Sequence, residues 1–404
     1  MARDDRERRP TVFIIAGEES GDILGSSLMA ALAARLGGRV RFLGVGGQRM
    51  QRLGLASLFP IEEISLHGIS EVLLRIPRLL GRIRQTARAV AAASPDVLVL
   101  VDAPAFNLRV GHRVRRLAPG IPIVDYVSPS VWAYAPGRAR RMARFVDRLL
   151  AILPFEPAVH RRLGGPATFY VGHPLLQRLE DLRPAAGERT QLTAGTKPVL
   201  VVLPGSRRSE VTRLMPVFGE TVGKVAGRPG GVEVLLSAVP RLAAEVRAMA
   251  AAWPVAPTIV EGEAATYAAF RRSHAALAAS GTVTLELALS GVPMVVAYRL
   301  DAFLKVLRHL LKAHSIVLAN LVLGENVIPE FIDADAEPER LARALLPLLS
   351  LTPDRARQLA AFGQIEALMA LESGTPSARA AEIVAEAMQP PALAGGVATG
   401  IKVG

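Results

Sequence analysis

The sequence predicts an α/β protein made of two consecutive Rossmann-like halves. In the first half, an apolar strand at Thr11–Ala16 runs into the glycine-rich turn Gly17–Asp22, and Ile23–Leu36 then has apolar residues at helical spacing. The order of strand, glycine-containing turn and helix returns at Val199–Leu203, after a polar stretch without periodicity at Leu182–Lys197. Because strands that alternate with helices form a parallel sheet, ligands are expected at the carboxyl ends of the strands. The cleft between the two halves is therefore the predicted active site.

The remaining elements are predicted from short apolar runs and from apolar residues at helical spacing. Further strands are expected at Val40–Leu43 (before the glycine-rich turn Gly44–Gly47), Asp96–Val101, Ile121–Tyr126, Leu149–Leu153, Val232–Ser237, Thr258–Val260, Ala275–Ala279 and Met294–Tyr298. Further helices are expected at Leu66–Ile83, Thr282–Ser290, Glu337–Leu349, Pro353–Leu371 and Ser377–Met388. The predicted division is a disordered start (1–10), a first domain (11–181), a linker (182–197), a second domain (198–365), C-terminal helices (366–388) and a disordered tail (389–404).

Composition restricts the classes of function. At 404 residues the chain is long enough for two domains with full cores, and with no cysteine it has no disulfide, thiolate zinc site or cysteine nucleophile. It has neither an apolar run long enough to span a membrane nor the apolar region of a secretory signal. The net charge of +12 suits a phosphorylated substrate or an anionic membrane surface, or reflects arginine-rich codon usage. Basic and aromatic residues are not interleaved, so no nucleic acid partner is expected.

Two interpretations of Ser280-Gly281-Thr282 are open on this stretch alone. The residues lie between the expected strand Ala275–Ala279 and the helix that follows it. Free backbone N–H groups and the positive end of the helix dipole form a phosphate site at such a place. A plain helix with Ser280 as its N-cap gives the same pattern. Glu286 follows one turn later, where a carboxylate can hold a pair of ribose hydroxyls.

A second candidate phosphate turn follows Val199–Leu203. Gly205 lets the backbone approach a ligand, Ser206 offers a hydroxyl, and the Arg207 guanidinium can bind two phosphate oxygens at once. The alternative is a surface turn with solvated arginines, and the position directly after a strand favours the phosphate.

Asp102 is the candidate catalytic carboxylate. It comes directly after the strand Asp96–Val101, and a carboxylate at that edge of a parallel sheet is well placed to act as a general base over the cleft. A turn-forming aspartate before a helix is the commoner explanation of such a residue.

Two amphipathic basic stretches, one in each half, indicate contact with a membrane surface. The first is Leu66–Ile83, with Arg78 and Arg82 beside an apolar stripe, and Pro77 is expected to kink it. The second is Asp301–His314, with Lys305 and Arg308 among leucines. Ordinary core-facing helices with a solvated basic side have the same pattern.

The chain resembles the lipid A disaccharide synthases along roughly Val12 to Met388. The resemblance rests on the combination and order of these motifs: Ala16-Gly17-Glu18 with Ser20–Gly25; Gly44–Gly47 with Met50; Val101–Pro104 with Phe106-Asn107-Leu108; Ser128–Ala133; Tyr170–Pro174; Leu203–Arg207 with Ser209-Glu210; Ala279–Thr282 with Leu285-Glu286; and Asn320-Leu321 with Val327–Glu330. The resemblance implies a GT-B fold, in which two Rossmann-like domains face each other across a cleft. It also implies that the C-terminal helix packs back on the N-terminal domain.

The resemblance further implies a reaction. A UDP-2,3-diacylglucosamine donor gives its sugar to 2,3-diacylglucosamine 1-phosphate, the acylated glucosamine 1-phosphate acceptor, with inversion. The products are the β-1,6-linked lipid A disaccharide 1-phosphate and UDP. Family members act without a bound metal, a cofactor or an enzyme nucleophile. They are cytoplasmic and peripheral on the anionic inner face of the inner membrane of Gram-negative bacteria, so the resemblance implies that location here.

On the donor side, the resemblance implies that cationic and backbone groups neutralise the leaving diphosphate. Arg207 and the Ser280-Gly281-Thr282 turn are the candidates, and Ser206 assists them. Glu286 is the candidate for the ribose, and Asn320 matches an asparagine that the family has near the donor.

On the acceptor side, Asp102 matches the family's catalytic carboxylate and is expected to be the general base on the acceptor hydroxyl. Glu18, Ser20 and Asp22 are expected to line the facing turn and to hold the acceptor; whether Asp102 or Glu18 is the direct base stays open.

Three positions depart from the family pattern, namely Glu19, Arg208 and Ala319, and none of them removes a proposed functional group. Two rival functions remain. One is a non-hydrolysing UDP-sugar epimerase or another GT-B transferase. The other is a membrane-surface binding protein that has lost its chemistry, which the presence of Asp102 and Arg207 disfavours.

Overall fold

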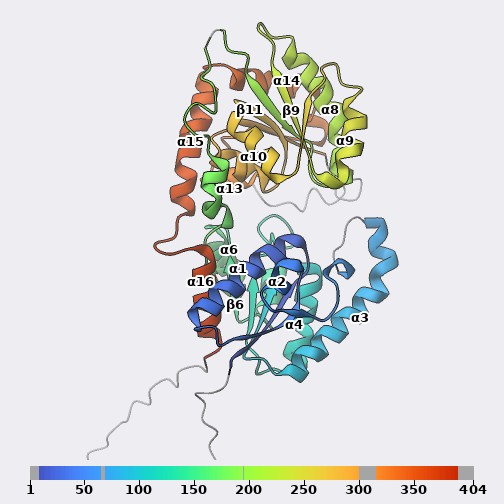
Figure 1. The fold of residues 1–404 in the computed structure, drawn as a ribbon, viewed down its shortest axis with the longest axis vertical. Helices are drawn as coiled ribbons and strands as arrows, with labels where there is room; N and C mark the ends of the chain where they lie inside the picture. The colour runs from blue at the N-terminus through green and yellow to red at the C-terminus, as the bar shows by residue number, and fades with distance from the viewer. Residues whose placement is uncertain (1–8, 65–68, 194, 300–314, 390–404) are drawn as a thin grey trace, which may run out of the picture.

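The computed structural model describes residues 9–64, 69–193, 195–299 and 315–389. Two α/β domains are stacked along the long axis of the molecule, each around one parallel sheet (Figure 1). The first sheet has the strand order β3-β2-β1-β4-β5-β6-β7. Its strands are β1 (Thr11–Ala16), β2 (Arg41–Val45), β3 (Ala56–Ser57), β4 (Val97–Val101), β5 (Ile123–Tyr126), β6 (Arg148–Ala151) and β7 (Ala167–Tyr170).

Helices cover both faces of the first sheet. They are α1 (Glu19–Arg35), α2 (Gln48–Arg52), α3 (Ile69–Ala93), α4 (Pro104–Leu117), α5 (Gly137–Met142) and α6 (Glu156–Leu163). Alternation along the strands divides the core into two layers. Val12 and Ile14 of β1 face α1, whereas Phe13 and Ile15 face α3 and α4.

The second sheet has the order β10-β9-β8-β11-β12-β13. Its strands are β8 (Val199–Leu203), β9 (Glu233–Ala238), β10 (Thr258–Glu261), β11 (Ala275–Ala279), β12 (Met294–Tyr298) and β13 (Glu330–Ile332). The helices of this half and of the C-terminal segment are α7 (Leu179–Leu182), α8 (Arg208–Ala226), α9 (Ala243–Ala250), α10 (Glu263–Arg272), α11 (Val283–Leu289), α13 (Leu318–Leu323), α14 (Pro338–Leu345), α15 (Pro353–Met369) and α16 (Pro376–Ala387). Helices α8, α9 and α14 pack on one face, and α10, α11, α13 and α15 pack on the other.

The chain crosses between the domains twice. Leu175 and Leu182 pack in the core of the second domain, so the first crossing lies ahead of residues 182–197. The second crossing follows α15. Helix α16 then packs on α1 of the first domain (Figure 1), and Arg148 of β6 pairs with Glu386 of α16 at 2.8 Å.

The polar segment 182–197 is anchored to the second domain. The guanidinium of Arg189 donates hydrogen bonds of 2.8–3.2 Å to four backbone carbonyls, those of Phe270, Arg271, Ser290 and Gly291. These carbonyls end α10 and α11, where helices leave acceptors without intrahelical partners. A stretch that lacks any periodicity is therefore anchored by one half-buried cation.

The main strands lie where the sequence predicts them, and the helix bounds differ most in two places. Helix α1 begins at Glu19, so the predicted turn Gly17–Asp22 is reduced to its first two residues. The acidic residues Glu19 and Asp22 stabilise the first turn of a helix through the helix dipole. Their effect outweighs the low helix propensity of Gly21. Helix α3 contains Pro77 and continues to Ala93, ten residues beyond the predicted end at Ile83. The strands that the sequence analysis missed, β3, β7 and β13, all lie at sheet edges.

Candidate active site

The candidate acceptor site lies where the strand order of the first sheet reverses. Strands β1 and β4 are neighbours there, and their carboxyl ends lead into Glu18 and Asp102. Ser20, at the start of α1, donates a hydrogen bond of 2.8 Å from Oγ to Oδ2 of Asp102. The structure therefore brings Asp102 and Ser20 into direct contact, and Glu18 is exposed on the adjoining turn. A crevice outside the strand ends at such a point is the usual ligand site of an open α/β sheet.

The backbone at Asp102 is strained. Asp102 and Ala103 have positive φ angles of 54° and 44°, a region that costs a residue with a Cβ about 1–3 kcal/mol. Gly17 allows the close approach of this loop, because a Cβ at residue 17 would lie 2.3 Å from that of Ala103. Tyr126 accepts the N–H of Asp102 at 2.9 Å. Strain of this kind is held in place only where the surrounding structure determines it.

Asp22 does not line the acceptor site, so this prediction is wrong. Its carboxylate is buried and accepts the backbone N–H groups of Gly47, Arg49 and Met50 at 2.8–3.2 Å. These donors begin α2, and a helix leaves its first N–H groups without intrahelical partners. Asp22 thus joins α1 to the glycine-rich turn after β2.

A second carboxyl group lies near Asp102, and the sequence analysis missed it. Asp125 is buried near the carboxyl end of β5. Burial, and secondly the charge of Asp102, raise the pKa of Asp125 well above its usual range. Burial thus disfavours the ionised form of Asp125, which lies beside Asp102 at the carboxyl ends of the strands. The signal was a lone aspartate inside an apolar strand.

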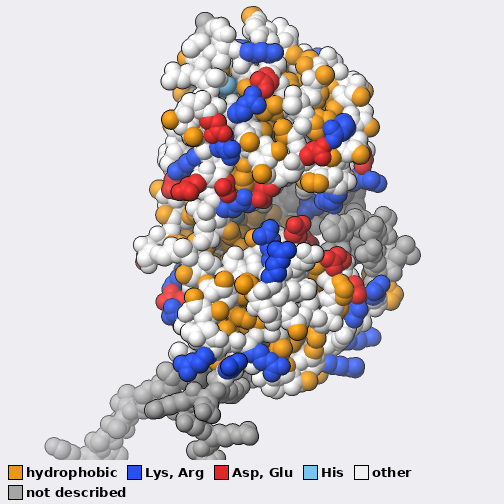
Figure 2. All heavy atoms as spheres, in the orientation of Figure 1, with side chains coloured by type: hydrophobic (Ala, Val, Ile, Leu, Met, Phe, Trp, Pro, Cys, Tyr) orange, Lys and Arg blue, Asp and Glu red, His pale blue; other side chains and the backbone are white. Residues whose placement is uncertain are grey.

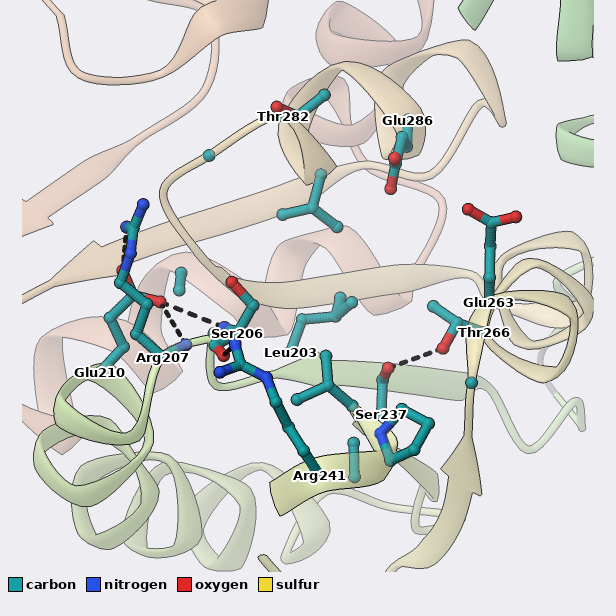
Figure 3. A pocket seen from close by; sticks show the side chains of 18 of the residues that line it. Leu203, Ser206, Arg207, Glu210, Ser237, Arg241, Glu263, Thr266, Thr282 and Glu286 are labelled. Atoms are coloured by element: carbon teal, nitrogen blue, oxygen red, sulfur yellow. Dashed lines mark hydrogen bonds and ion pairs between the residues drawn. The ribbon is translucent and has the colours of Figure 1, made fainter. Parts of the chain in front are cut away.

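The candidate donor site is a pocket of about 820 Å³ in the second domain. The face of the molecule in Figure 2 is hollowed between the domains, with acidic and basic side chains around the hollow. Residues after β8, β9 and β11 line the pocket, and Glu19 of the first domain completes it. Ser206, Arg207, Ser280, Gly281, Thr282 and Glu286 all belong to this lining (Figure 3).

Glu210 organises the loop that carries Ser206 and Arg207. Its carboxylate accepts the backbone N–H groups of Ser206 and Arg207 at 3.1 and 3.2 Å and the Arg207 guanidinium at 2.9 Å. Gly205 has φ of 111°, and a Cβ there would lie 2.5 Å from Glu210 Oε2. Only glycine fits this position without strain. The signal for Glu210 was its place three residues after the N-cap of α8, where a carboxylate caps the helix start.

Arg207 is an exposed cation of the pocket lining, which also contains Arg241. Its side chain is 74% exposed although it pairs with Glu210. Burial acts to lower the pKa of Arg207, but Glu210, Tyr298 and Glu18 act in the opposite direction and leave the pKa raised. Glu18 is a residue of the first domain, so Arg207 experiences negative charge from both sides of the cleft. Because the loop N–H groups of Ser206 and Arg207 are already paired, an anion here would be bound by the guanidinium and the Ser206 hydroxyl.

The turn after β11 is not capped by Ser280, so that interpretation is wrong. Ser280 donates from Oγ to the carbonyl of Ile316 at 2.6 Å, and Thr282 is the N-cap of α11 without a side-chain hydrogen bond. Helix α11 has seven residues, so its dipole is small. The turn contributes to the pocket mainly through its backbone and the exposed Thr282 hydroxyl.

Glu286 points into the pocket from α11 (Figure 3). Burial, and then the negative charge of Glu263, raise its pKa from 4.5 to about 7. The hydroxyl of Tyr267 donates to Glu286 Oε1 at 3.4 Å, and the Arg178 guanidinium lies 4.8 Å from the centre of the Tyr267 ring. Glu286 is thus a half-buried carboxylate with one weak partner, which leaves acceptor capacity for a ligand.

Asn320 is not among the residues that line the pocket, and its predicted place near the donor stays a prediction. It is buried in α13, where Nδ2 donates to the carbonyl of Ile328 and Oδ1 accepts the N–H of Ile328, both at 2.9 Å. Both ends of the amide are therefore used to hold the segment before β13.

The two predicted membrane residues of α3 differ in environment. Arg82 is anchored: it contacts Glu63 at 2.6 Å, donates to Gln85 at 2.6 Å and lies over the ring of Phe59 at 4.6 Å. These contacts hold the guanidinium against the protein, and the membrane contact of Arg82 stays a prediction. Arg78 also pairs with Glu63, but its side chain is 66% exposed.

Lys305 and Arg308 lie outside the described residues. Among the described helices, none combines the length and the apolar character needed to cross a bilayer. The described part of the chain likewise contains no group of three acidic or histidine side chains placed to hold a metal ion.

Residues 12–384 match the lipid-A-disaccharide synthetase family. The chain belongs to this family. Lipid-A-disaccharide synthase of Nitrobacter hamburgensis is 54% identical over 380 residues, which is 93% of this chain and 95% of the relative. The enzyme of the same name from Rhodospirillum centenum is 45% identical, covering 92% of this chain and 93% of the relative. The chain is accordingly a glycosyltransferase of lipid A biosynthesis.

Solved structures show the same two-domain GT-B fold at low sequence identity. MurG of Acinetobacter baumannii superposes with a TM-score of 0.58 at 14% identity, over 93% of this chain and 99% of that one. UDP-GlcNAc 2-epimerase from Methanocaldococcus jannaschii, solved in complex with UDP-GlcNAc and UDP, also gives 0.58 at 14% identity, over the same shares. At this identity the likeness establishes the fold alone.

Proposed function

We propose that the protein joins UDP-2,3-diacylglucosamine to 2,3-diacylglucosamine 1-phosphate, giving the β-1,6 disaccharide 1-phosphate and UDP. Family membership over residues 12–384 carries the proposal. The pocket supports it, because it combines an exposed guanidinium at Arg207 with a carboxylate at Glu286 that has acceptor capacity to spare. These groups suit the diphosphate and the ribose of a UDP-sugar.

In the proposed mechanism, Asp102 removes the proton from the 6-hydroxyl of the acceptor. The acceptor oxygen then attacks the anomeric carbon on the face opposite the diphosphate. The bond from that carbon to the diphosphate oxygen breaks with its electron pair on UDP, and Arg207 stabilises the charge that develops there. Ser20 orients Asp102 through their 2.8 Å hydrogen bond, and Glu18 on the adjoining turn contacts the acceptor.

The reaction can be tested with the two purified acylated sugars. We expect disaccharide 1-phosphate and one UDP per disaccharide. Mass spectrometry measures the disaccharide, and a nucleotide assay measures the released UDP. Epimerised UDP-sugar formed without acceptor would instead identify an epimerase. Binding of both sugars with no product would identify a binding protein.

The raised pKa of Glu286 predicts a pH-dependent affinity for UDP-sugars. The pKa is about 7 without ligand, and ribose hydroxyls donate to the ionised carboxylate. Affinity should therefore fall as pH drops through 7, by roughly tenfold per unit at the limit. UDP-N-acetylglucosamine is the suitable ligand for calorimetry, because its diphosphate has no monoester proton in this range. Glu286→Gln should bind weakly at every pH and abolish the dependence; an unchanged pH profile in this variant would exclude Glu286 as the source.

The same pKa fixes the sign of a stability effect. The folded state holds the Glu286 proton between the ordinary pKa of 4.5 and about 7, whereas the unfolded chain has released it. The unliganded fold therefore loses stability from this group as pH rises across that interval. Bound UDP-sugar should weaken this trend, since it favours the ionised form of Glu286 and so lowers the pKa of the folded state.

We further propose that the protein is peripheral on the anionic cytoplasmic face of the inner membrane and binds it through α3. Ile76 and Leu80, one turn apart on α3, are 39% and 37% exposed. Arg78, two residues from each, projects from another side of the helix, and its side chain is 66% exposed. Apolar side chains that enter the interface, with a long cationic side chain that reaches lipid phosphate from the side of the helix, fit this arrangement. The acylated substrates of the proposed reaction require access to such a surface.

Reversing one charge should release the protein from the membrane. Arg78→Glu changes two units of charge at the surface, worth about 2 kcal/mol or roughly 30-fold in vesicle partitioning. Sedimentation with phosphatidylglycerol-containing vesicles measures this. Ile76→Ser with Leu80→Ser should act in the same direction. Leu351→Ser is the matched control, because Leu351 is 77% exposed in the second domain; unchanged sedimentation of the α3 variants would contradict docking through α3.

A further inference from the structure

Asn107 is a wholly buried polar residue in the first turn of α4, and none of the roles above involves it. Its Nδ2 donates towards three backbone carbonyls, those of Ile15 at 3.3 Å, Val101 at 3.0 Å and Asp102 at 2.8 Å. Ile15 belongs to β1, and Val101 is the last residue of β4. One amide group thus joins the ends of the two strands at which the sheet order reverses.

Only the NH₂ group of the Asn107 side chain makes hydrogen bonds in the described part of the chain. Its Oδ1 is buried and has no hydrogen-bond partner in the described part of the chain. A buried polar atom without a partner is unfavourable. The presence of an asparagine here is therefore not explained by hydrogen bonds at both ends of its amide. The NH₂ group offers two hydrogens to three carbonyl acceptors. Among the described residues, it is the only side-chain group that donates to these three carbonyls.

The shortest of the three bonds ends on the residue with the strained backbone. Asp102 and Ala103 both have φ angles near +50°, and the Asp102 carbonyl that accepts from Asn107 lies between them. Without that donor, the peptide can rotate towards the β region, which residues with a Cβ prefer. Such a rotation would carry the Asp102 carboxylate away from Ser20 Oγ, its 2.8 Å partner.

We propose that Asn107 is a positioning residue for the transfer reaction. It holds the left-handed backbone of Asp102 so that the carboxylate stays against Ser20 and faces the acceptor. The inference rests on the proposed role of Asp102 as general base. Misplacement of a reacting group by about 1 Å can cost about 10²-fold in rate, so the effect should appear in turnover more than in substrate affinity.

The first test replaces the donor. Asn107→Ala should lower kcat by roughly 10- to 100-fold, with KM for the UDP-sugar within about twofold of the parent. Asn107→Asp keeps the shape, and when protonated it has one donor hydrogen in place of two, so it should fall between the parent and alanine. If Asn107→Ala does not fold, the kcat of Asn107→Asp alone tests the proposal. A fall confined to KM, or normal kcat in both variants, would overturn the proposal.

The second test separates positioning from general destabilisation. In an Asp102→Asn background, Asn107→Ala should reduce the residual kcat by no more than about twofold, because no base remains to be positioned. Full additivity of the two losses would show that Asn107 does not act through Asp102. Near-normal turnover of Asp102→Asn alone would instead remove the base assignment itself, which keeps the two failures distinguishable.

A matched control measures the loss of a buried hydrogen bond elsewhere. Thr221 is fully buried in α8, and its Oγ1 donates to the carbonyl of Val217 at 2.7 Å. Thr221→Val should lower the unfolding temperature without a change in kcat. If it lowers kcat as Asn107→Ala does, the effect of Asn107 is one of stability and the proposal is wrong.

Discussion

Replacing Asp102 by asparagine is expected to lower turnover by roughly 10²–10⁴-fold, the usual contribution of a general base. Asparagine tolerates the positive φ of 54° at this position and can keep the contact with Ser20, so the substitution removes the base with little change in shape. Because the donor pocket belongs to the second domain, affinity for UDP should be unchanged. Single-turnover kinetics with both acylated sugars, together with calorimetry of UDP, measure the two quantities.

Asp147 provides the control for this variant. It directly precedes β6 and therefore lies at the amino-terminal ends of the strands, whereas Asp102 lies at their carboxyl ends. There it pairs with Arg115 at 2.5 Å. Asp147→Asn should leave turnover within about twofold, because exposed ion pairs contribute little. If Asp102→Asn is as active as this control, another group is the base, and Glu18 becomes the next residue to replace.

Replacing Arg207 by alanine is expected to lower turnover by roughly 10²–10³-fold, the loss seen when one group that stabilises a developing oxyanion is removed. The loop should remain in place, because Glu210 still accepts the backbone N–H groups of residues 206 and 207. Arg207→Lys should recover only part of the rate, since an ammonium cannot bind two oxygens in one plane. Steady-state kcat and the Kd of UDP together show whether the loss lies in binding or in the transition state.

Arg208 is the neighbouring control. Its side chain is 76% exposed and pairs with Glu245 at 2.8 Å, whereas Arg207 pairs with Glu210. We expect Arg208→Ala to have near-normal kcat. Equal losses in the two variants would mean that general positive charge, rather than the Arg207 guanidinium, favours departure of UDP.

Local patterns predicted much of the fold. Strands β1, β8, β11 and β12 have the predicted bounds, since each is a short apolar run between turn residues. The short strands β3, β7 and β13 were missed, because an edge strand is held by a neighbour that a local pattern does not contain. The predicted linker gave no sign that Arg189 anchors it, since its four partners lie about 80–100 residues away.

The sequence predicted where the candidate residues lie in the fold better than it predicted what their side chains contact. Asp102, Ser206, Arg207 and Glu286 follow strands or begin helices, and the structure places them around the cleft or at the strand ends beside it. Asp22 and Asn320 were expected to contact substrates and Arg82 a membrane surface, and the structure shows that their polar groups have partners within the protein. A polar residue in a motif can serve a ligand or a distant backbone group, and the residue type alone does not distinguish these uses.

The sequence by itself determined that this chain forms two parallel α/β domains, and it predicted that the strand ends carry the chemistry. Both follow from apolar periodicity and from the order of glycine-rich turns, which are local. The family resemblance came from the combination and order of the motifs. Only the tertiary structure decided which side chains face the cleft. The partners of Asp22 lie 25–28 residues away, and Asn107 reaches Ile15 across 92 residues. Such hydrogen bonds exist only after the strands pair, because folding brings the buried backbone groups that require partners next to the side chains that supply them.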